Sequence, residues 1–193
     1  MHQRSHLELT EIKQELTTLA KLFNSSSKST LLLGPDATEK NFRNLELEKF
    51  NTIAFATHGL LRQEIPGLKE SALVLTPPQQ VEFENDGLLK ASEIATMQLN
   101  ADLVILSACN TNVTDSKNRS QLSSLSTAFL SAGVKSLLVT QWSVESKSAA
   151  FLTTETIKRF RTNPEEGLAK ALTHAVNNAA NDHRHDPSEV TAQ

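Results

Sequence analysis

The sequence predicts an α/β domain with a mostly parallel central sheet and helices on both faces of that sheet. Three short, nearly continuous apolar runs are the first observation, and such runs are typical of strands buried on both faces. These runs span 52–57, 101–108 and 134–141. The second observation is that segments with helical spacing of apolar residues lie between and around these runs. Strands that alternate with helices favour a doubly wound arrangement.

Helical periodicity predicts the remaining elements. Apolar residues recur at three- and four-residue steps from Leu7 to Phe23, which indicates one face of a helix. The further predicted helices cover 37–45, 122–132, 145–160 and 164–180. Gly133 directly follows the second of these further helices and is a natural helix cap. A short strand is predicted at 31–34, a surface loop at 77–85 and a loose tail at 182–193.

The composition excludes several classes of protein. A chain of 193 residues suits one domain, and a net charge of −3 without a basic stripe gives no indication of a nucleic-acid partner. The single cysteine, Cys109, excludes an internal disulfide and a zinc ribbon, and a lone thiol fits a reducing compartment. No apolar run approaches the length of a membrane span. We therefore expect a cytoplasmic protein that binds neither nucleic acid nor membrane.

Two residues with nucleophile and base chemistry follow two of the predicted strands. His58 comes directly after the first strand, and Cys109 directly after the second. Ligands bind at the carboxyl ends of the strands in an open parallel sheet, so both side chains are expected at one edge. An imidazole beside a thiol lowers the thiol pKa and can protonate a leaving amine. The backbone N–H groups of Gly59 and Cys109 are candidates for holding an oxyanion.

Each of these residues also has an ordinary structural interpretation. A lone cysteine after an apolar strand is usually a buried thiol, and a histidine at a strand end is usually a surface residue. Their joint placement favours a dyad, because His58 and Cys109 are 51 positions apart. Caspase-type enzymes have their histidine roughly 50 residues before the cysteine.

Five segments, in order along the chain, resemble motifs of a known protein family. They are Phe55–Leu60, Asp86–Leu89 with Glu93 and Ile94, Val104–Thr111, Ala128–Gly133 and Val139–Val144. Together they resemble the motifs of the CHAT family, which are caspase-like domains often attached to tetratricopeptide repeats. The resemblance runs from about residue 15 to about residue 176.

The resemblance implies a caspase–haemoglobinase fold, which is a three-layer sandwich around a mostly parallel sheet. It implies a peptidase domain over 1–181, incomplete at one or both ends, followed by the tail at 182–193. It further implies that Cys109 and His58 form a dyad that cleaves proteins or peptides without a cofactor or a metal. Gating by a partner, or by a sensor domain of the tetratricopeptide type in a longer protein, is implied by the same resemblance.

The segment after the third predicted strand is a candidate substrate pocket. Residues 141–146 are similar to a segment of CHAT and separase-like peptidases in which an acidic group receives a basic P1 residue. Ser146 stands where the acid is expected, and Glu145 is the nearest carboxylate. Trp142 is a candidate lining residue. Both also have structural interpretations, Glu145 in the first turn of the next helix and Trp142 in the core.

Alternative functions remain open at this point. Asn110 and Asn112 depart from the CHAT pattern, and they favour an inactive signalling or interaction module on the same fold. A flavodoxin-like binding domain would need a phosphate-holding loop after its first strand, and the sequence offers none. Asp86 and Glu93 have the wrong spacing for an acid pair on one helix face, so turn and cap roles are expected for them.

Overall fold

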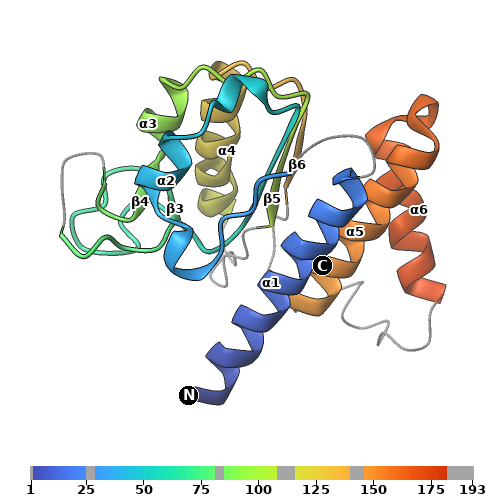
Figure 1. Cartoon of the computed structure of the whole chain (residues 1–193), viewed down its shortest axis with the longest axis horizontal. Coiled ribbons are helices and arrows are strands. Elements are labelled where there is room, and N and C mark those ends of the chain that lie inside the picture. The colour runs from blue at the N-terminus through green and yellow to red at the C-terminus, as the bar shows by residue number, and fades with distance from the viewer. Residues whose placement is uncertain (1, 25–28, 81–84, 108–115, 140–145, 182–193) are drawn as a thin grey trace. The chain divides into compact units, whose positions relative to one another are not determined.

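The computed structural model describes residues 2–24, 29–80, 85–107, 116–139 and 146–181 (Figure 1). The chain divides into two compact units. One unit is continuous and covers 32–143, whereas the other joins 1–31 to 144–193. The predicted dyad and both predicted oxyanion groups belong to the continuous unit.

A parallel sheet with the strand order β1–β5–β6 forms the centre of the continuous unit. Its strands are β1 (Thr52–Ala56), β5 (Leu103–Ser107) and β6 (Leu137–Val139). Each lies within one of the three predicted runs, so the α/β class and the parallel sheet are confirmed. All 5 residues of the central strand β5 are buried, as expected of a strand with both faces covered.

One face of this sheet packs against helices α2 (Glu39–Arg43) and α4 (Ser116–Ser131). The ring of Phe55 in β1 lies 5.2 Å from that of Phe42 in α2 and 5.7 Å from that of Phe129 in α4. Aromatic rings in such arrangements contribute much of the apolar burial of a core. Helices on this face agree with the prediction, and helices on the second face stay a prediction.

Helix α4 ends in a Schellman motif at Gly133, whose φ is +100°. The Val134 N–H donates to the Phe129 carbonyl and the Gly133 N–H to the Leu130 carbonyl, both at 3.1 Å. A Cβ atom at position 133 would lie 2.4 Å from the carbonyl oxygen of Leu99. The predicted capping role of Gly133 is therefore confirmed.

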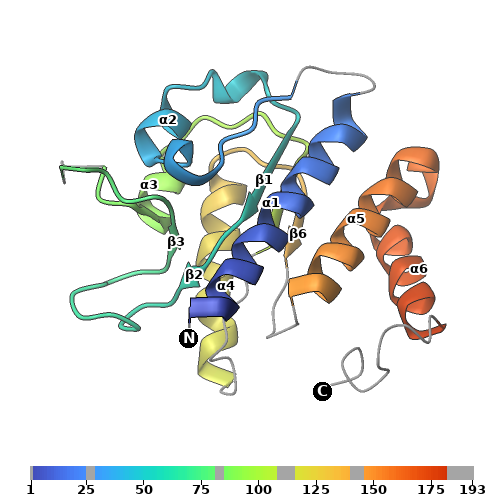
Figure 2. The same cartoon turned by 60° about the horizontal axis from the view of Figure 1, so that its bottom comes forward.

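An antiparallel sheet with the order β2–β3–β4 lies in the connection between β1 and β5. Its strands are β2 (Gly59–Leu60), β3 (Ala72–Val74) and β4 (Leu88–Lys90), and β4 leads directly into helix α3 (Ala91–Ala95). Figure 2 shows β2 at the end of β1. The sequence did not predict these strands, because runs of 2 or 3 residues are too short to show a periodicity.

The described residues of the second unit form three helices. They are α1 (His2–Asn24), α5 (Ser146–Thr162) and α6 (Gly167–Asn181), with the 3₁₀ turn η3 (Pro164–Glu166) between the last two. Helix α5 packs against both α1 and α6. Ala171, Ala175 and Ala179 of α6 are buried at four-residue spacing, which gives α6 a flat packing face. The predicted helices of this unit are confirmed within a few residues at their ends.

The predicted strand at 31–34 is wrong. Leu32 packs against the hydrophobic core, Leu31 is exposed, and Gly34 already belongs to the 3₁₀ turn η1 (Gly34–Asp36). The Asp36 N–H closes that turn on the Leu33 carbonyl at 3.1 Å. This apolar run meets the core through a side chain, without a strand partner among the described residues.

Other predictions need smaller changes. Helix α2 is shorter than predicted, because the Thr38 side chain caps it by accepting the Asn41 N–H and the chain turns after Arg43. A second 3₁₀ turn, η2 (Leu47–Lys49), comes next. The surface loop is confirmed at 77–80, whereas 81–84 and the predicted tail at 182–193 lie outside the described residues. In the described part of the chain, no helix is both long and apolar enough to span a bilayer.

Candidate active site

His58 lies where the chain leaves the parallel sheet and enters the antiparallel one. It comes two positions after the end of β1, and the residue is exposed. The His58 carbonyl accepts the N–H of Val74, the last residue of β3, at 2.8 Å. The side-chain hydroxyl of Thr57 donates to the carbonyl oxygen of the same Val74. His58 is thus tied by its backbone to the antiparallel sheet at the edge where β1 ends.

The register of β1 against β5 is the second feature of this edge. Ile53 pairs with Val104 and Ala56 with Ser107, so partners are 51 positions apart throughout the ladder. The Thr57 N–H continues the contact by donating to the Ser107 carbonyl at 3.3 Å. His58 and Cys109 are separated by the same 51 positions. Cys109 itself lies outside the described residues.

Gly59 is buried and pairs with Leu73 of β3. The bond from the Val74 N–H to the His58 carbonyl makes Gly59 and Leu73 a non-hydrogen-bonded pair of the antiparallel ladder. In such a pair the N–H groups point away from the partner strand. The N–H of Gly59 is therefore not used in the pairing with β3, as an oxyanion donor requires.

The structure does not describe the remaining predicted site residues. Trp142, Glu145 and Cys109 with its backbone N–H all fall in 108–115 and 140–145. Their roles stay predictions. Both stretches directly follow described strands of the parallel sheet, namely β5 and β6.

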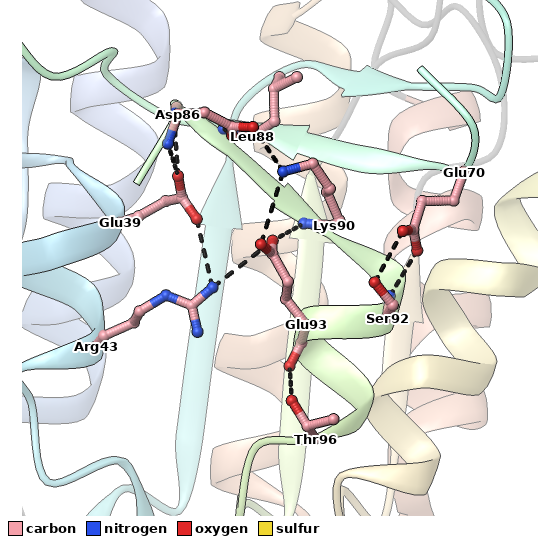
Figure 3. Close-up of polar contacts among 10 residues, drawn as sticks. Glu39, Arg43, Glu70, Asp86, Leu88, Lys90, Ser92, Glu93 and Thr96 are labelled. Atoms are coloured by element: carbon pink, nitrogen blue, oxygen red, sulfur yellow. Dashed lines mark hydrogen bonds and ion pairs between the residues drawn. The ribbon is translucent and has the colours of Figure 1, made fainter. Parts of the chain in front are cut away.

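Asp86 and Glu93 have the turn and cap roles expected of them (Figure 3). The Asp86 carboxylate accepts the Leu88 N–H at 2.9 Å, and the Glu93 carboxylate accepts the Lys90 N–H at 2.8 Å. The Lys90 ammonium lies between the two acids, 2.6 Å from Asp86 and 3.6 Å from Glu93. These residues fix the strand β4 and the start of α3, and no catalytic role is needed to explain them.

The acidic groups around Lys90 change its pKa. Partial burial lowers the pKa of Lys90, but the hydrogen bond to Asp86 and the charges of Glu93, Asp86 and Glu39 together raise it by more. The net result is a pKa above the usual 10.5. Lys90 is therefore a cation at neutral pH that holds two carboxylates together.

Glu39 is the important residue that sequence reasoning missed. Its side chain is completely buried, and one carboxylate oxygen accepts the N–H groups of both Asp86 and Gly87 at 2.8 Å. The other oxygen faces Arg43 at 3.4 Å, and Arg43 also lies 3.6 Å from Glu93. Glu39 thereby anchors the turn before β4 to helix α2 (Figure 3).

Among the described residues, no group of three or more histidines, cysteines and acids is arranged to hold a metal ion. The acidic cluster around Lys90 is satisfied by its own cations and backbone donors.

A protein-family model of the CHAT domain matches residues 1–191, nearly the whole chain. A search of the curated proteins finds no match.

Proposed function

Because the chain belongs to the CHAT domain family, which is a caspase-like family, we propose that it is a cysteine endopeptidase with Cys109 as nucleophile and His58 as base. The substrate is a protein or peptide, and no cofactor takes part. The match extends over both compact units. That extent supports a single domain, for which we propose the three-layer caspase–haemoglobinase sandwich over 1–181 and a tail at 182–193.

The register of the parallel sheet is the observation that carries this proposal. Partners in β1 and β5 are 51 positions apart, and the contact continues at least to the Thr57 N–H and the Ser107 carbonyl. Extending that offset pairs His58 with Cys109. Paired residues of neighbouring strands are about 4.8 Å apart and direct their side chains to the same face. A thiol and an imidazole so placed are within reach of a hydrogen bond.

The chemistry is that of a thiol–imidazole pair. The Cys109 thiolate attacks the carbonyl carbon of the scissile peptide, and the N–H groups of Gly59 and Cys109 hold the oxyanion. The C–N bond breaks while the His58 imidazolium gives its proton to the leaving amine. Water, activated by the neutral imidazole, then hydrolyses the thioester and regenerates the thiol.

We place this enzyme in the cytoplasm, under the control of a partner or an attached sensor domain of the tetratricopeptide type. A catalytic thiol must remain reduced, and the chain's one cysteine has no internal disulfide partner. Control by a second component fits the position of His58, which is exposed, since a substrate or partner can approach it directly.

The alkylation rate of Cys109 as a function of pH tests the dyad without a known substrate. A thiolate maintained by His58 should react quickly at pH 7. In His58→Ala the rate should fall about tenfold per pH unit below about pH 8.5, as for an ordinary thiol. Cys109→Ala should not label, because the chain has no second cysteine. Equal rates with and without His58 would contradict the peptidase and favour an inactive signalling module.

Peptide cleavage provides the second test once a substrate is found. Cys109→Ala should abolish turnover, and His58→Ala should reduce it about 10²–10⁴-fold. The double variant should be no worse than Cys109→Ala alone, because His58 then has nothing to activate. A further loss in the double variant would show that His58 acts independently of the thiol.

Trp142 and Glu145 are the proposed lining of the P1 pocket. Both come after β6, whose carboxyl end lies beside that of β5 in the same parallel sheet. If the Glu145 carboxylate receives the P1 side chain, the enzyme prefers Lys or Arg there, and Glu145→Gln should lose that preference. Profiling a peptide library with wild type, Glu145→Gln and Glu155→Gln on helix α5 measures this. An unchanged P1 preference in Glu145→Gln would remove Glu145 from the pocket.

A further inference from the structure

We propose that Thr57 is a positioning residue for His58 and acts through Val74. This inference rests on the proposed dyad, because it concerns the residue that orients the catalytic base. Nothing in the sequence distinguishes Thr57 from any other threonine that ends a strand. The hydrogen bonds that the structure gives Thr57 distinguish it from the others.

Thr57 is bonded to both sheets at once. Its N–H donates to the Ser107 carbonyl at the end of β5, and its hydroxyl donates to the carbonyl oxygen of Val74 in β3. The N–H of that same Val74 donates to the His58 carbonyl at 2.8 Å. Two consecutive residues, 57 and 58, are therefore held by the two backbone groups of one residue.

The Thr57 hydroxyl occupies a position that a regular ladder would give to His58. Gly59 pairs with Leu73 and Leu60 with Ala72, so the next pair along the ladder would be His58 with Val74. A hydrogen-bonded antiparallel pair exchanges two bonds, and the second would run from the His58 N–H to the Val74 carbonyl. The Thr57 hydroxyl donates to this carbonyl. The antiparallel ladder thus stops before His58.

Val74, to which the His58 backbone is bonded, is itself held in place by its neighbours. Val74 pairs with Leu88 of β4, and the Leu75 N–H donates to the Gly87 carbonyl at 2.8 Å. Gly87 is held from helix α2 by the buried carboxylate of Glu39. A rigid acceptor allows one hydroxyl to set the backbone direction at the next residue, and a base that is misplaced by about 1 Å loses on the order of a hundredfold in rate.

Removing the hydroxyl should redirect His58. In Thr57→Val the Val74 carbonyl loses its side-chain donor, and the His58 N–H is a main-chain group that can replace it. That exchange would extend the ladder by one residue and rotate the imidazole away from its orientation in the wild type. Thr57→Ser retains the hydroxyl and should retain the orientation.

The experiment measures the alkylation rate of Cys109 against pH in the full chain, together with the thermal midpoint. Wild type is compared with Thr57→Val, Thr57→Ser, His58→Ala and the control Thr76→Val. The control removes a similar bond, since the Thr76 hydroxyl donates to the Gly34 carbonyl at 2.7 Å. Thr57→Val should lower the rate at pH 7 on the order of tenfold to a hundredfold and approach the profile of His58→Ala. Thr57→Ser and Thr76→Val should behave as wild type.

The outcomes separate this inference from the proposed function. A slow His58→Ala with a Thr57→Val that matches Thr76→Val would overturn the positioning role and leave the dyad intact, even if both threonine variants melt earlier. A His58→Ala that reacts as quickly as wild type would overturn the dyad and the positioning role with it. A slow Thr57→Val that Thr57→Ser rescues would support both.

Discussion

The buried carboxylate of Glu39 accepts the backbone N–H of Gly87 at 2.8 Å, across 48 positions of sequence. The same oxygen accepts the N–H of Asp86, so one acidic side chain satisfies two donors of a turn. Backbone donors that are buried without an acceptor are costly, and this turn has its acceptor on a different element. The antiparallel sheet that holds His58 therefore depends on a residue of helix α2.

Glu39→Ala should destabilise the protein by about 1–3 kcal/mol for each donor left without an acceptor. Glu39→Gln should cost less, because the amide oxygen can still accept the two N–H groups. Urea unfolding measures both. Glu46→Ala is the control, because Glu46 is exposed and forms its ion pair with the exposed Lys49, three positions along. Equal stability of Glu39→Ala and Glu46→Ala would show that the turn does not need its anchor.

Gly133→Ala should be more destabilising than Gly67→Ala. Both glycines have positive φ, +100° and +88°, so each alanine costs about 1–2 kcal/mol for the left-handed backbone. The added Cβ at Gly133 meets the Leu99 carbonyl oxygen at 2.4 Å, whereas nothing lies within 4 Å at Gly67. Overpacking should add about 1–3 kcal/mol. Denaturant unfolding of the two variants measures the difference, and equal losses would contradict the close approach.

Lys90→Met should remove a stabilisation that is lost at alkaline pH. The folded-state pKa of Lys90 is raised above 10.5, so its contribution is fully present below pH 10.5 and is lost as pH rises through the folded pKa. The difference in unfolding free energy between wild type and Lys90→Met should therefore be constant from about pH 7 to about pH 10 and shrink at higher pH. Lys40→Met, at an exposed position of α2, is the control.

Glu166→Gln should show the opposite dependence. The hydrogen bonds from Arg159, at 2.7 and 3.0 Å, lower the pKa of Glu166 below its usual 4.5 against a smaller effect of burial. The stabilisation is therefore present above pH 4.5 and is lost as pH falls through the folded pKa. The thermal midpoint of Glu166→Gln should lie below that of wild type at about pH 7 and approach it in acid, as the carboxylate becomes protonated. Glu165→Gln, at the neighbouring position, is the control.

The parallel sheet was predictable because its strands lie in short, nearly continuous apolar runs, which favour strands covered on both faces. The central strand 103–107 is buried at every position, and its sequence has five consecutive apolar or small residues, which predict such burial. The strands β2, β3 and β4 were not predictable, because they exist only through pairing with one another. The strand predicted at 31–34 was wrong for the opposite reason. Its three leucines form an apolar run that contacts the core without joining a sheet.

The candidate site was predictable in part for the same reason. His58 comes after a strand that the sequence identifies, and its place at the end of β1 is confirmed, whereas its role as a base stays a prediction. Glu39 gave no signal, because an acid in the first turn of a helix is already favoured by the helix dipole. The hydrogen bond from the Thr57 hydroxyl could not be predicted, because its acceptor, the Val74 carbonyl, belongs to a strand that the sequence does not indicate.

The two sheets differ in the distance along the chain between paired residues. Leu60 pairs with Ala72, 12 positions away, whereas Ile53 must find Val104, 51 positions away. Closing a longer loop costs more chain entropy, and pairing between distant residues is slow. Because the antiparallel sheet lies inside the connection between β1 and β5, forming it first would shorten the loop that these two strands must close. We therefore expect the antiparallel segment after His58 to form before the central sheet closes during folding.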